Sequence, residues 1–336
     1  MKKIFLFGYY GEGNLGDDLL LRGLLEILGK DCQIGVLIKK KSKDNPYLQF
    51  KKNVISDLVR GVRWSDVVIG GGGGLFQDKT SFRSFLYYLT IIWLSLFNGK
   101  PVYLVGQSFS PLRNKYNEFL LKKSLNLCNE ILVRDLFSMT YLKNIGVSSQ
   151  KIFYSPDLVF LLNFPVKDKN EDIGLNFRPW KTLDLEKLED VLLKLLREGK
   201  KLIYFVFDRQ EDKKVFESLS DSLRNNISLI TYDNDSFFET FSSCKFIIGM
   251  RLHSSILSVI TNTPFIALSY DEKVSSFCMD INWRYVLPLL ELSKIPEFLK
   301  EMDQRYGELC KYLLEIRKEL KDKVKSDMEE FKKEVC

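Results

Sequence analysis

Residues 244–273 are the stretch that most restricts how this chain can fold. Residues 244–249 (CKFIIG) are short and apolar, which predicts a buried strand; residues 251–261 predict a helix, and residues 265–268 predict a second strand. The helix is expected to end at residues 262–264 (NTP), because proline cannot continue it. Two strands that are joined through a helix run parallel to each other, so the stretch predicts one unit of a parallel sheet.

The same alternation of short apolar segments and helical segments runs along most of the chain. Strands are expected at residues 3–7, 33–38, 65–69, 101–106, 130–133, 173–177, 202–207 and 227–231. Helices are expected at residues 17–28, 82–97, 115–128, 136–145, 183–198, 211–223 and 236–243. This order predicts an α/β protein with two doubly wound, Rossmann-like domains (residues 1–160 and 173–295), which face a central cleft, and a long C-terminal helical segment (residues 296–336).

The composition of the 336 residues is that of a globular protein, and it narrows the class of partner. A net charge of +6 favours anionic partners but does not indicate nucleic acid. The cysteines lack the CxxC or CxxH spacing of metal sites, so we expect no metal and interpret them as reduced thiols of a cytosolic protein. They are Cys32, Cys128, Cys244, Cys278, Cys310 and Cys336. The apolar run within residues 1–8 is too short for a signal peptide.

Residues 85–97 (FLYYLTIIWLSLF) are uncharged and strongly apolar. They cover only about half of the length that spans a bilayer. The favoured interpretation is a helix buried in the α/β core. The alternative is an interfacial helix with Tyr87, Tyr88 and Trp93 at the level of the lipid headgroups, where the basic loop at residues 39–52 would be a second contact.

The first turn of the helix expected at residues 251–261 carries candidate functional side chains. Arg251, His253 and Ser254 lie at its start, and Lys273 follows the next strand. A helix N-terminus favours an anion, and histidine exchanges protons near neutral pH. The pattern fits an anion site with a proton donor, but it also fits an ordinary histidine and an exposed arginine at a helix start.

Two further arginines are expected at strand ends. Arg134 follows the strand at residues 130–133, and Arg178 follows the strand at residues 173–177. The ordinary explanation of such an arginine is a salt bridge to a helix start. Together with Arg251 and Lys273, however, these residues give four cations at predicted cleft positions. Four cations favour an anionic substrate that carries a phosphate and a carboxylate.

Residues 11–16 (GEGNLG) match the GxGxxG pattern of dinucleotide-binding proteins. We do not favour that function, because the second strand ends in lysines at positions 39–41 and offers no acidic residue to a ribose. Asp17 and Asp18 would also face the pyrophosphate, and either of them is more simply the cap of the first helix. The alternative is that Asn14 and Asp17 hold a hydroxylated acceptor.

Five consecutive glycines, residues 70–74, follow a buried strand. Glycine permits positive φ angles and a close approach of the backbone, so a ligand or the facing domain is expected to come near Gly72, Gly73 and Gly74. The run lacks the Lys-Ser/Thr pair of a Walker loop, so hydrolysis of a nucleoside triphosphate is not expected.

In this order and spacing, the motifs resemble the polysaccharide pyruvyl transferase family, most closely its CsaB-type cell-wall branch. The resemblance covers roughly residues 3–279 and rests on residues 8–17 (GYYGEGNLGD), 70–78 (GGGGGLFQD), 133–135 (VRD), 178–180 (RPW), 249–253 (GMRLH) and 270–273 (YDEK). It implies a glycosyltransferase B-like fold of two Rossmann-like domains. It also implies transfer of pyruvate from phosphoenolpyruvate, a co-substrate, to two hydroxyls of one sugar, with a cyclic ketal and phosphate as products and no cofactor.

The implied acceptor is a lipid-linked precursor of secondary cell-wall polysaccharide that contains N-acetylmannosamine. The implied location is the cytoplasm or the inner face of the cell membrane. The family's functional arginine, histidine and lysine fall on Arg134, His253 and Lys273, and Arg251 precedes the histidine as it does in the family. We expect His253 to act as general acid and Asp17 to orient or deprotonate the acceptor hydroxyl.

Two rival functions stay open. A glycosyltransferase that uses a nucleotide sugar would share the fold, and it should bind a nucleoside diphosphate rather than phosphoenolpyruvate. A non-catalytic protein that binds a glycan or a lipid carrier would keep its function when His253 is replaced.

Overall fold

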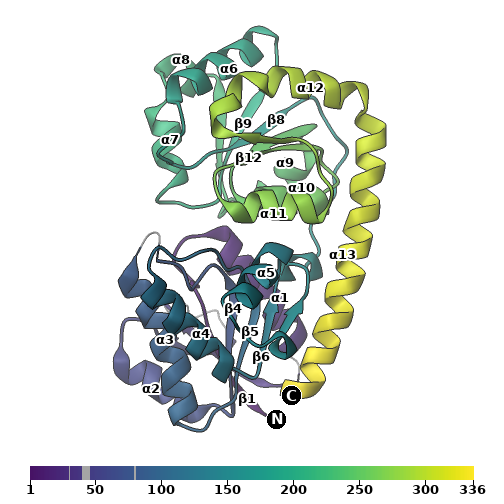
Figure 1. Ribbon diagram of the computed structural model, residues 1–336. Helices are drawn as coiled ribbons and strands as arrows, with labels where there is room; N and C mark the ends of the chain where they lie inside the picture. The colour runs from purple at the N-terminus through teal and green to yellow at the C-terminus, as the bar shows by residue number, and fades with distance from the viewer. Residues whose placement is uncertain (30, 40–45, 79–80) are drawn as a thin grey trace. The chain divides into compact units, whose positions relative to one another are not determined.

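The computed structural model describes residues 1–29, 31–39, 46–78 and 81–336. The chain divides into two compact units: unit 1 comprises Met1–Leu162 and Lys321–Cys336, and unit 2 comprises Asn163–Leu320. Each unit has its own parallel sheet flanked by helices (Figure 1). The predicted α/β class, with two Rossmann-like units and a long C-terminal helix, is therefore confirmed. The central cleft between two domains stays a prediction.

Unit 1 is built on a seven-stranded sheet with the order β3-β2-β1-β4-β5-β6-β7, in which all neighbouring strands are parallel. The strands are β1 Lys3–Phe7, β2 Gln33–Ile38, β3 Leu48–Lys51, β4 Val67–Gly73, β5 Val102–Gln107, β6 Glu130–Val133 and β7 Ile152–Tyr154. The helices are α1 Leu15–Leu28, α2 Ile55–Trp64, α3 Phe82–Phe97, α4 Lys115–Leu127 and α5 Leu136–Asn144, with 3-10 helices η1 Ser149–Lys151 and η2 Leu158–Leu161.

Unit 2 repeats this plan with six parallel strands in the order β10-β9-β8-β11-β12-β13. The strands are β8 Ile173–Asn176, β9 Leu202–Val206, β10 Ile227–Thr231, β11 Phe246–Gly249, β12 Phe265–Ser269 and β13 Val286–Pro288. The helices are α6 Leu185–Arg197, α7 Asp212–Ser218, α8 Asp221–Arg224, α9 Phe237–Ser243, α10 Leu252–Ile260, α11 Glu272–Asp280, η3 Leu289–Lys294, α12 Ile295–Gln304 and α13 Tyr306–Val335.

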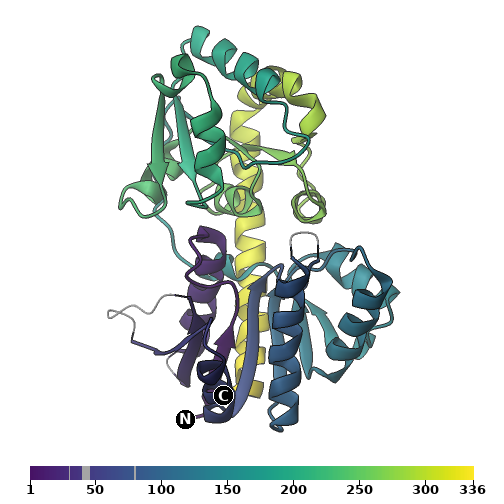
Figure 2. The same cartoon turned by 90° about the vertical axis from the view of Figure 1, so that its left-hand side faces the viewer.

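Helix α13 contributes residues to both units. It lies within the helical segment expected at residues 296–336, and its side chains Leu313 in unit 2 and Val324 and Phe331 in unit 1 are buried. In unit 1 the ring of Phe331 packs edge-on against Tyr103 of β5, with 5.6 Å between the ring centroids. The two chain termini lie close together within unit 1 in both views (Figures 1 and 2).

The expectation that all six cysteines are reduced thiols is wrong for one pair. Cys32, which follows α1, forms a disulfide with Cys336 at the end of α13. The two cysteines are separated by 304 positions, so their spacing in the sequence holds no sign of the pairing. Of the others, Cys128 and Cys244 are buried and free, and burial raises the pKa of each thiol to about 12.

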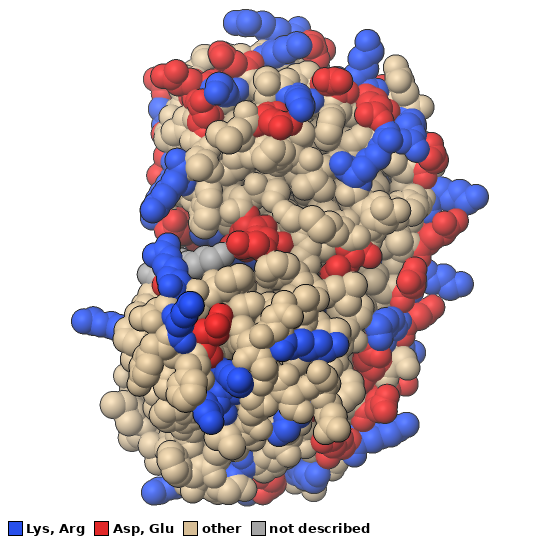
Figure 3. All heavy atoms as spheres, viewed as in Figure 1, with Lys and Arg blue, Asp and Glu red and all other residues tan. Residues whose placement is uncertain are grey.

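Helix α3 has one buried face and one exposed face. Phe85 and Tyr88 lie in the core of unit 1, as the favoured interpretation of residues 85–97 requires. Tyr88 therefore does not lie at a headgroup level. The opposite face of α3 is nevertheless apolar, and the surface of unit 1 around it is mostly uncharged (Figure 3). None of the helices in the described ranges combines the length and the apolarity needed to cross a membrane.

Two other local expectations were wrong. The segment at residues 39–52, expected as a loop, contains a strand, β3, which pairs with β2; its residues 40–45, which include three of its lysines, lie outside the described residues. The helix expected at residues 211–223 is two helices, because Leu219 adopts an extended conformation between them.

Candidate functional site

Each sheet reverses its strand order beside its first strand. The reversal lies between β1 and β4 in unit 1 and between β8 and β11 in unit 2. Open α/β sheets bind ligands beyond the carboxyl ends of the strands at such a point. The side chains that follow these strands are therefore the candidates for binding and chemistry.

In unit 2, Arg251 is held in a buried ion pair with Asp212. Its Nε lies 2.8 Å and its Nη2 lies 2.6 Å from Asp212 Oδ1, and Nη2 is also 3.3 Å from Asp208 Oδ2. Arg251 is 8% exposed and Asp212 is fully buried. Burial raises the pKa of the Asp212 carboxyl, and Arg251 opposes that rise. This ion pair favours a structural role for Arg251, because buried carboxylates already balance its charge; binding of a substrate by Arg251 stays a prediction.

The same ion pair fixes the start of α10. Asn176, the last residue of β8, donates from Nδ2 to Asp212 Oδ2 (3.1 Å) and accepts from the backbone N–H of Arg251 (3.2 Å). Asp212 also accepts from the backbone N–H groups of Phe207 and Asp208. The sequence analysis did not predict a role for Asn176 or Asp212. Asp208 and Asp212, four residues apart after the buried strand β9, could have indicated Asp212.

Ser254 is a packing residue in this arrangement. Its hydroxyl is fully buried and donates to the Arg251 carbonyl at 2.6 Å. A side chain on Gly249 would collide with Ser254, so the glycine allows the helix to start this close to the strand. This geometry favours a structural role for Ser254, and its contact with a substrate stays a prediction.

His253 occupies the second position of α10 and is half-buried. The residue at the N-cap, Arg251, makes no side-chain capping bond to the helix. By contrast, Asp271 caps α11 by accepting from the backbone N–H of Lys273 at 3.2 Å. The N-terminus of α10 therefore has no side-chain cap, and its partial positive charge favours an anion.

Two of the predicted site cations, Arg178 and Lys273, lie around Tyr270 in unit 2. Within the ranges that the structure covers, neither Arg178 nor Lys273 forms an ion pair with an acidic side chain. Arg178 donates from Nη1 to the Tyr270 hydroxyl (3.2 Å), and its Nε is buried without a hydrogen-bond partner. The guanidinium lies 5.5 Å from the ring centroid of Trp180 and 5.1 Å from that of Tyr270.

The charges around Tyr270 act on its hydroxyl. Burial raises the pKa of Tyr270, but Lys273, Arg178 and Arg251 more than offset the rise, so its pKa is lowered. The Lys273 ammonium lies 5.8 Å from the same ring. The structure thus brings Arg178 and Lys273 together around one tyrosine, in a positive field that suits an anion.

In unit 1, Arg134 has the ordinary partner of a strand-end arginine. Its Nη1 donates to Asp157 at 2.7 Å, and Asp157 caps η2. Its Nε donates to the Ser108 hydroxyl at 2.7 Å, which in turn donates to Asp135 at 2.8 Å. Arg134 is only 7% exposed. This geometry favours a positioning role; a catalytic role for Arg134 stays a prediction.

The glycine run packs against helix α1 at most of its positions. A Cβ atom on Gly72 would lie 2.6 Å from Leu20, and one on Gly73 would lie 2.6 Å from Asp17 Oδ1. Both glycines have positive φ angles, 68° and 85°. Contacts with α1 are thus enough to require glycine at both positions, and the approach of a ligand to Gly72 and Gly73 stays a prediction. Gly74 alone of the three has open space, with its nearest neighbour at 4.0 Å.

Asn14, not Asp17 or Asp18, caps the first helix. Its Oδ1 accepts from the backbone N–H groups of Gly16 (3.0 Å) and Asp17 (3.4 Å). Asp18 instead accepts from the backbone N–H of Gly11 at 2.9 Å and closes the glycine loop. Asp17 is half-buried against Gly73, at the carboxyl end of β4. The expected role of Asn14 in acceptor binding therefore competes with its role as a cap.

A cluster around Lys52 was missed in the sequence. Lys52 donates to Glu12 at 3.0 Å and to the Tyr88 hydroxyl at 3.1 Å, and its ammonium lies 4.7 Å from the Tyr9 ring centroid. Although burial raises the pKa of Glu12, its bonds to Lys39 and Lys52 lower it overall. Tyr9 and Glu12 follow β1, Lys39 follows β2 and Lys52 follows β3, so these four residues lie at the same edge of the sheet as Asp17.

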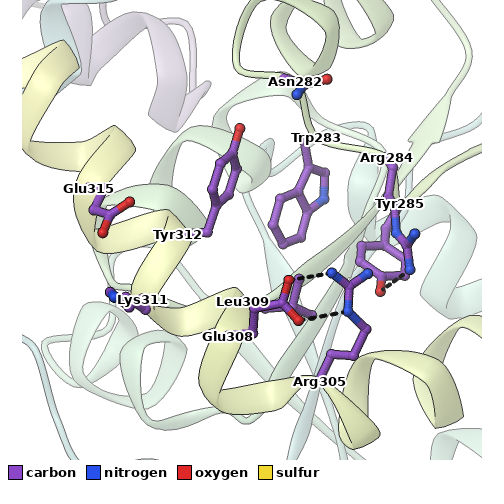
Figure 4. A pocket seen from close by; sticks show the side chains of 10 residues that line it. All are labelled: Asn282, Trp283, Arg284, Tyr285, Arg305, Glu308, Leu309, Lys311, Tyr312 and Glu315. Carbon is purple, nitrogen blue, oxygen red and sulfur yellow. Dashed lines mark hydrogen bonds and ion pairs between the residues drawn. The ribbon is translucent and has the colours of Figure 1, made fainter.

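A pocket of about 320 Å³ lies elsewhere in unit 2 (Figure 4). The indole of Trp283 donates to the carbonyl of Phe265, the first residue of β12, so the pocket is at the amino edge of the sheet and away from Arg178. Arg305 pairs with Glu308 at its rim. The lining residues are Asn282, Trp283, Arg284, Tyr285, Arg305, Glu308, Leu309, Lys311, Tyr312 and Glu315.

The sequence profile of the polysaccharide pyruvyl transferase family matches residues 14–272. The chain belongs to this family. The match covers most of both sheets and every candidate residue named above from Asn14 to Tyr270. This pyruvyl transferase homologue is therefore a transferase with a pyruvyl-transfer role in polysaccharide biosynthesis. Its assignment to the CsaB-type branch stays a prediction.

A curated relative and several solved structures are similar to this pyruvyl transferase homologue. The amylovoran biosynthesis protein AmsJ of Erwinia amylovora is 21% identical over 81% of this chain and 84% of AmsJ. The Anabaena protein HepE in complex with UDP-glucose is 11% identical, with a TM-score of 0.68 over 99% of both chains. MnaA of S. aureus in complex with UDP is 14% identical, with a TM-score of 0.62 over 92% of this chain and 91% of MnaA. These likenesses confirm the glycosyltransferase B-like fold.

Proposed function

We propose that the protein transfers the pyruvyl group of phosphoenolpyruvate to two hydroxyls of one sugar in a lipid-linked precursor of cell-wall polysaccharide. Membership of the pyruvyl transferase family supports the type of reaction. The observation that carries the choice of donor is the pair Arg178 and Lys273, which flank Tyr270 without an acidic partner in the described part of the chain. We further propose that the acceptor sugar is N-acetylmannosamine and that the reaction takes place in the cytoplasm.

Phosphoenolpyruvate carries two anionic groups, a phosphate and a carboxylate. In unit 2, the fork of Arg178 suits bidentate binding of either group, and Lys273 offers a point charge to the other. The N-terminus of α10, which has no side-chain cap, adds a partial positive charge for the phosphate. Arg251 assists indirectly, because its pair with Asp212 fixes that turn.

The reaction requires a proton on the methylene carbon of phosphoenolpyruvate, which leaves a positive centre on the central carbon. One sugar hydroxyl attacks that carbon and loses its proton, the carbon–oxygen bond to phosphate breaks, and the second hydroxyl then closes the ketal. Of the two hydroxyl protons, one balances the proton given to the methylene carbon and the other leaves with phosphate. We assign the proton donation to His253 and the acceptance of a hydroxyl proton to Asp17.

Binding of phosphoenolpyruvate to the purified protein tests the proposal directly. A ligand that binds only the folded state raises the melting temperature by mass action. Arg178→Gln removes a charge-assisted hydrogen bond, which is worth about 1.5–3 kcal/mol, and should weaken binding about 10- to 100-fold. Arg197→Gln, an exposed arginine in α6 of the same unit, is the matched control and should bind as the unmodified protein does.

The role of His253 needs a separate readout. His253→Gln should keep the binding of phosphoenolpyruvate but lose release of phosphate in the presence of a lipid-linked N-acetylmannosamine acceptor. An active His253→Gln variant would contradict the assignment of the proton donor. It would leave the proposed donor site intact.

The second candidate is a transferase that uses a nucleotide sugar. It is favoured by the fold, since HepE is described in complex with UDP and with UDP-glucose. Trp180 and Tyr270, whose rings lie 4.8 Å apart beside Arg178, would then contact the nucleotide. A rise in melting temperature with UDP and none with phosphoenolpyruvate would favour this candidate.

A further inference from the structure

The exposed face of α3 is mostly apolar, with Thr90 as a polar residue in its middle and Arg83 at its start. Phe82, Leu86, Trp93 and Phe97 recur at helical spacing on this face, and Phe97 is 87% exposed. The helix contains no acidic residue, and Arg83 is its single charged residue. A helix that serves only to cover a sheet has no need of an apolar outer face.

Helix α4 extends the same surface. It exposes Tyr116, Phe119 and Leu127, which are 63%, 52% and 60% exposed. The two helices pack side by side in unit 1, where the indole N–H of Trp93 donates to Ser124 of α4 at 2.7 Å (Figure 1). We refer to the exposed apolar side chains of both helices as the α3–α4 face.

The charges around the α3–α4 face are mainly positive. The two helices carry four cations and one carboxylate, a net charge of +3; the cations are Arg83, Lys115, Lys122 and Lys123. The carboxylate, Glu118, accepts a hydrogen bond from the Tyr141 hydroxyl at 3.1 Å. The part of unit 1 that carries these helices shows blue side chains on a mostly uncharged surface, with few red ones (Figure 3).

We propose that the α3–α4 face docks on the surface of a lipid bilayer that contains anionic lipids. Apolar patches of this kind mark interaction sites, and a patch rimmed by cations complements anionic headgroups. Tryptophan and tyrosine at the level of the headgroups, with phenylalanine and leucine deeper, are typical of interfacial helices. The helix lies on the bilayer and does not cross it, in agreement with its length.

This inference concerns binding rather than chemistry. It rests on the proposed function only for its purpose, which is to bring the enzyme to a lipid-linked acceptor. Binding to vesicles needs neither phosphoenolpyruvate nor acceptor, so failure of the docking surface and failure of the proposed reaction are distinguishable.

The test is co-sedimentation of the full chain with vesicles of phosphatidylcholine alone and of phosphatidylcholine with phosphatidylglycerol. The unmodified protein should bind the anionic vesicles and bind neutral ones more weakly. The double variant Phe97→Ser, Phe119→Ser should bind the anionic vesicles at least about tenfold more weakly, because two aromatic side chains no longer leave water. The matched control Leu290→Ser, Leu314→Ser changes two exposed leucines of unit 2 and should bind like the unmodified protein.

Trp93 supplies a second readout. Anionic vesicles should shift the tryptophan emission to shorter wavelength, and Trp93→Phe should remove that shift although the chain has three other tryptophans. Unchanged melting temperatures would show that the serine variants fold.

Three results would overturn the proposal. The first is a lack of binding by the unmodified protein. The second is equal weakening by the control variant. The third is a concentration-dependent dimer in sedimentation velocity that the double variant abolishes, which would assign the α3–α4 face to a second copy of the chain.

Discussion

Replacing Asp212 by asparagine should unfold unit 2 more readily, because it leaves the Arg251 guanidinium buried without its main counter-charge. Asp212 is fully buried and Arg251 is 8% exposed, so water cannot take the place of the lost carboxylate. The asparagine amide would also face the backbone N–H groups of Phe207 and Asp208, which now donate to Asp212 Oδ2.

The expected loss is large compared with the stability of a domain. Removing one partner of a buried ion pair costs about 3–5 kcal/mol, whereas a domain is stable by only about 5–15 kcal/mol. The measurement is unfolding in urea, monitored by hydrogen exchange of the backbone amides of unit 2. A probe of unit 2 alone is needed because a chain of two units need not unfold in one step. Asp190→Asn, an exposed aspartate on α6, is the matched control and should change stability by no more than about 0.5 kcal/mol.

A double variant separates the charge effect from simple loss of packing. Arg251→Met together with Asp212→Asn removes both charges, and it should recover part of the stability that Asp212→Asn alone loses. The reasoning would be refuted if Asp212→Asn kept its stability and bound phosphoenolpyruvate more tightly. Arg251 would then bind the substrate directly, and Asp212 would weaken that binding by neutralising its charge.

Three other outcomes follow from contacts described in the structure. Gly72→Ala should destabilise unit 1 by about 1–3 kcal/mol in urea unfolding, since α1 occupies the space of the new methyl group, whereas Gly74→Ala, with open space, should be near neutral. Burial lowers the pKa of Lys169 from 10.5 to about 8, so between these pH values the unfolded chain binds more protons than the folded one. The free energy of unfolding should therefore rise with pH across this window, by at most about 3 kcal/mol, and Lys169→Met should lose this rise. A thiol reductant should lower the melting temperature of the unmodified protein by opening the disulfide between Cys32 and Cys336, but it should have no such effect on Cys336→Ser.

The sequence predicted the repeated elements well because each of them is encoded locally. The apolar runs at residues 173–177 and 265–268 form β8 and β12, and the proline at the end of residues 262–264 follows the end of α10. Helix starts were less predictable, because Asn14, Asp17 and Asp18 are all acceptable caps and only the backbone geometry selects Asn14.

The candidate site was harder to predict, since its chemistry depends on pairs that are distant in the sequence. Arg251 and Arg178 look alike as strand-end arginines, yet only Arg251 meets a buried carboxylate, 39 positions away. The glycine run is ambiguous for a related reason: a backbone that a ligand can approach can also be approached by a helix, and at Gly72 the neighbour is helix α1. Tertiary partners, rather than residue type, decide which cations stay available.

The division of α13 between the two units has a consequence for the order in which the protein folds during synthesis. Chains generally fold from the N-terminus as the ribosome releases them. Here unit 2 is complete once Leu320 has emerged, whereas unit 1 still waits for Lys321–Cys336. Until then, β5 lacks the ring of Phe331 against Tyr103, and Cys32 has no partner. The domain that is translated first is therefore the one that is finished last, so a nascent chain should hold unit 1 in an unfinished state throughout the synthesis of unit 2.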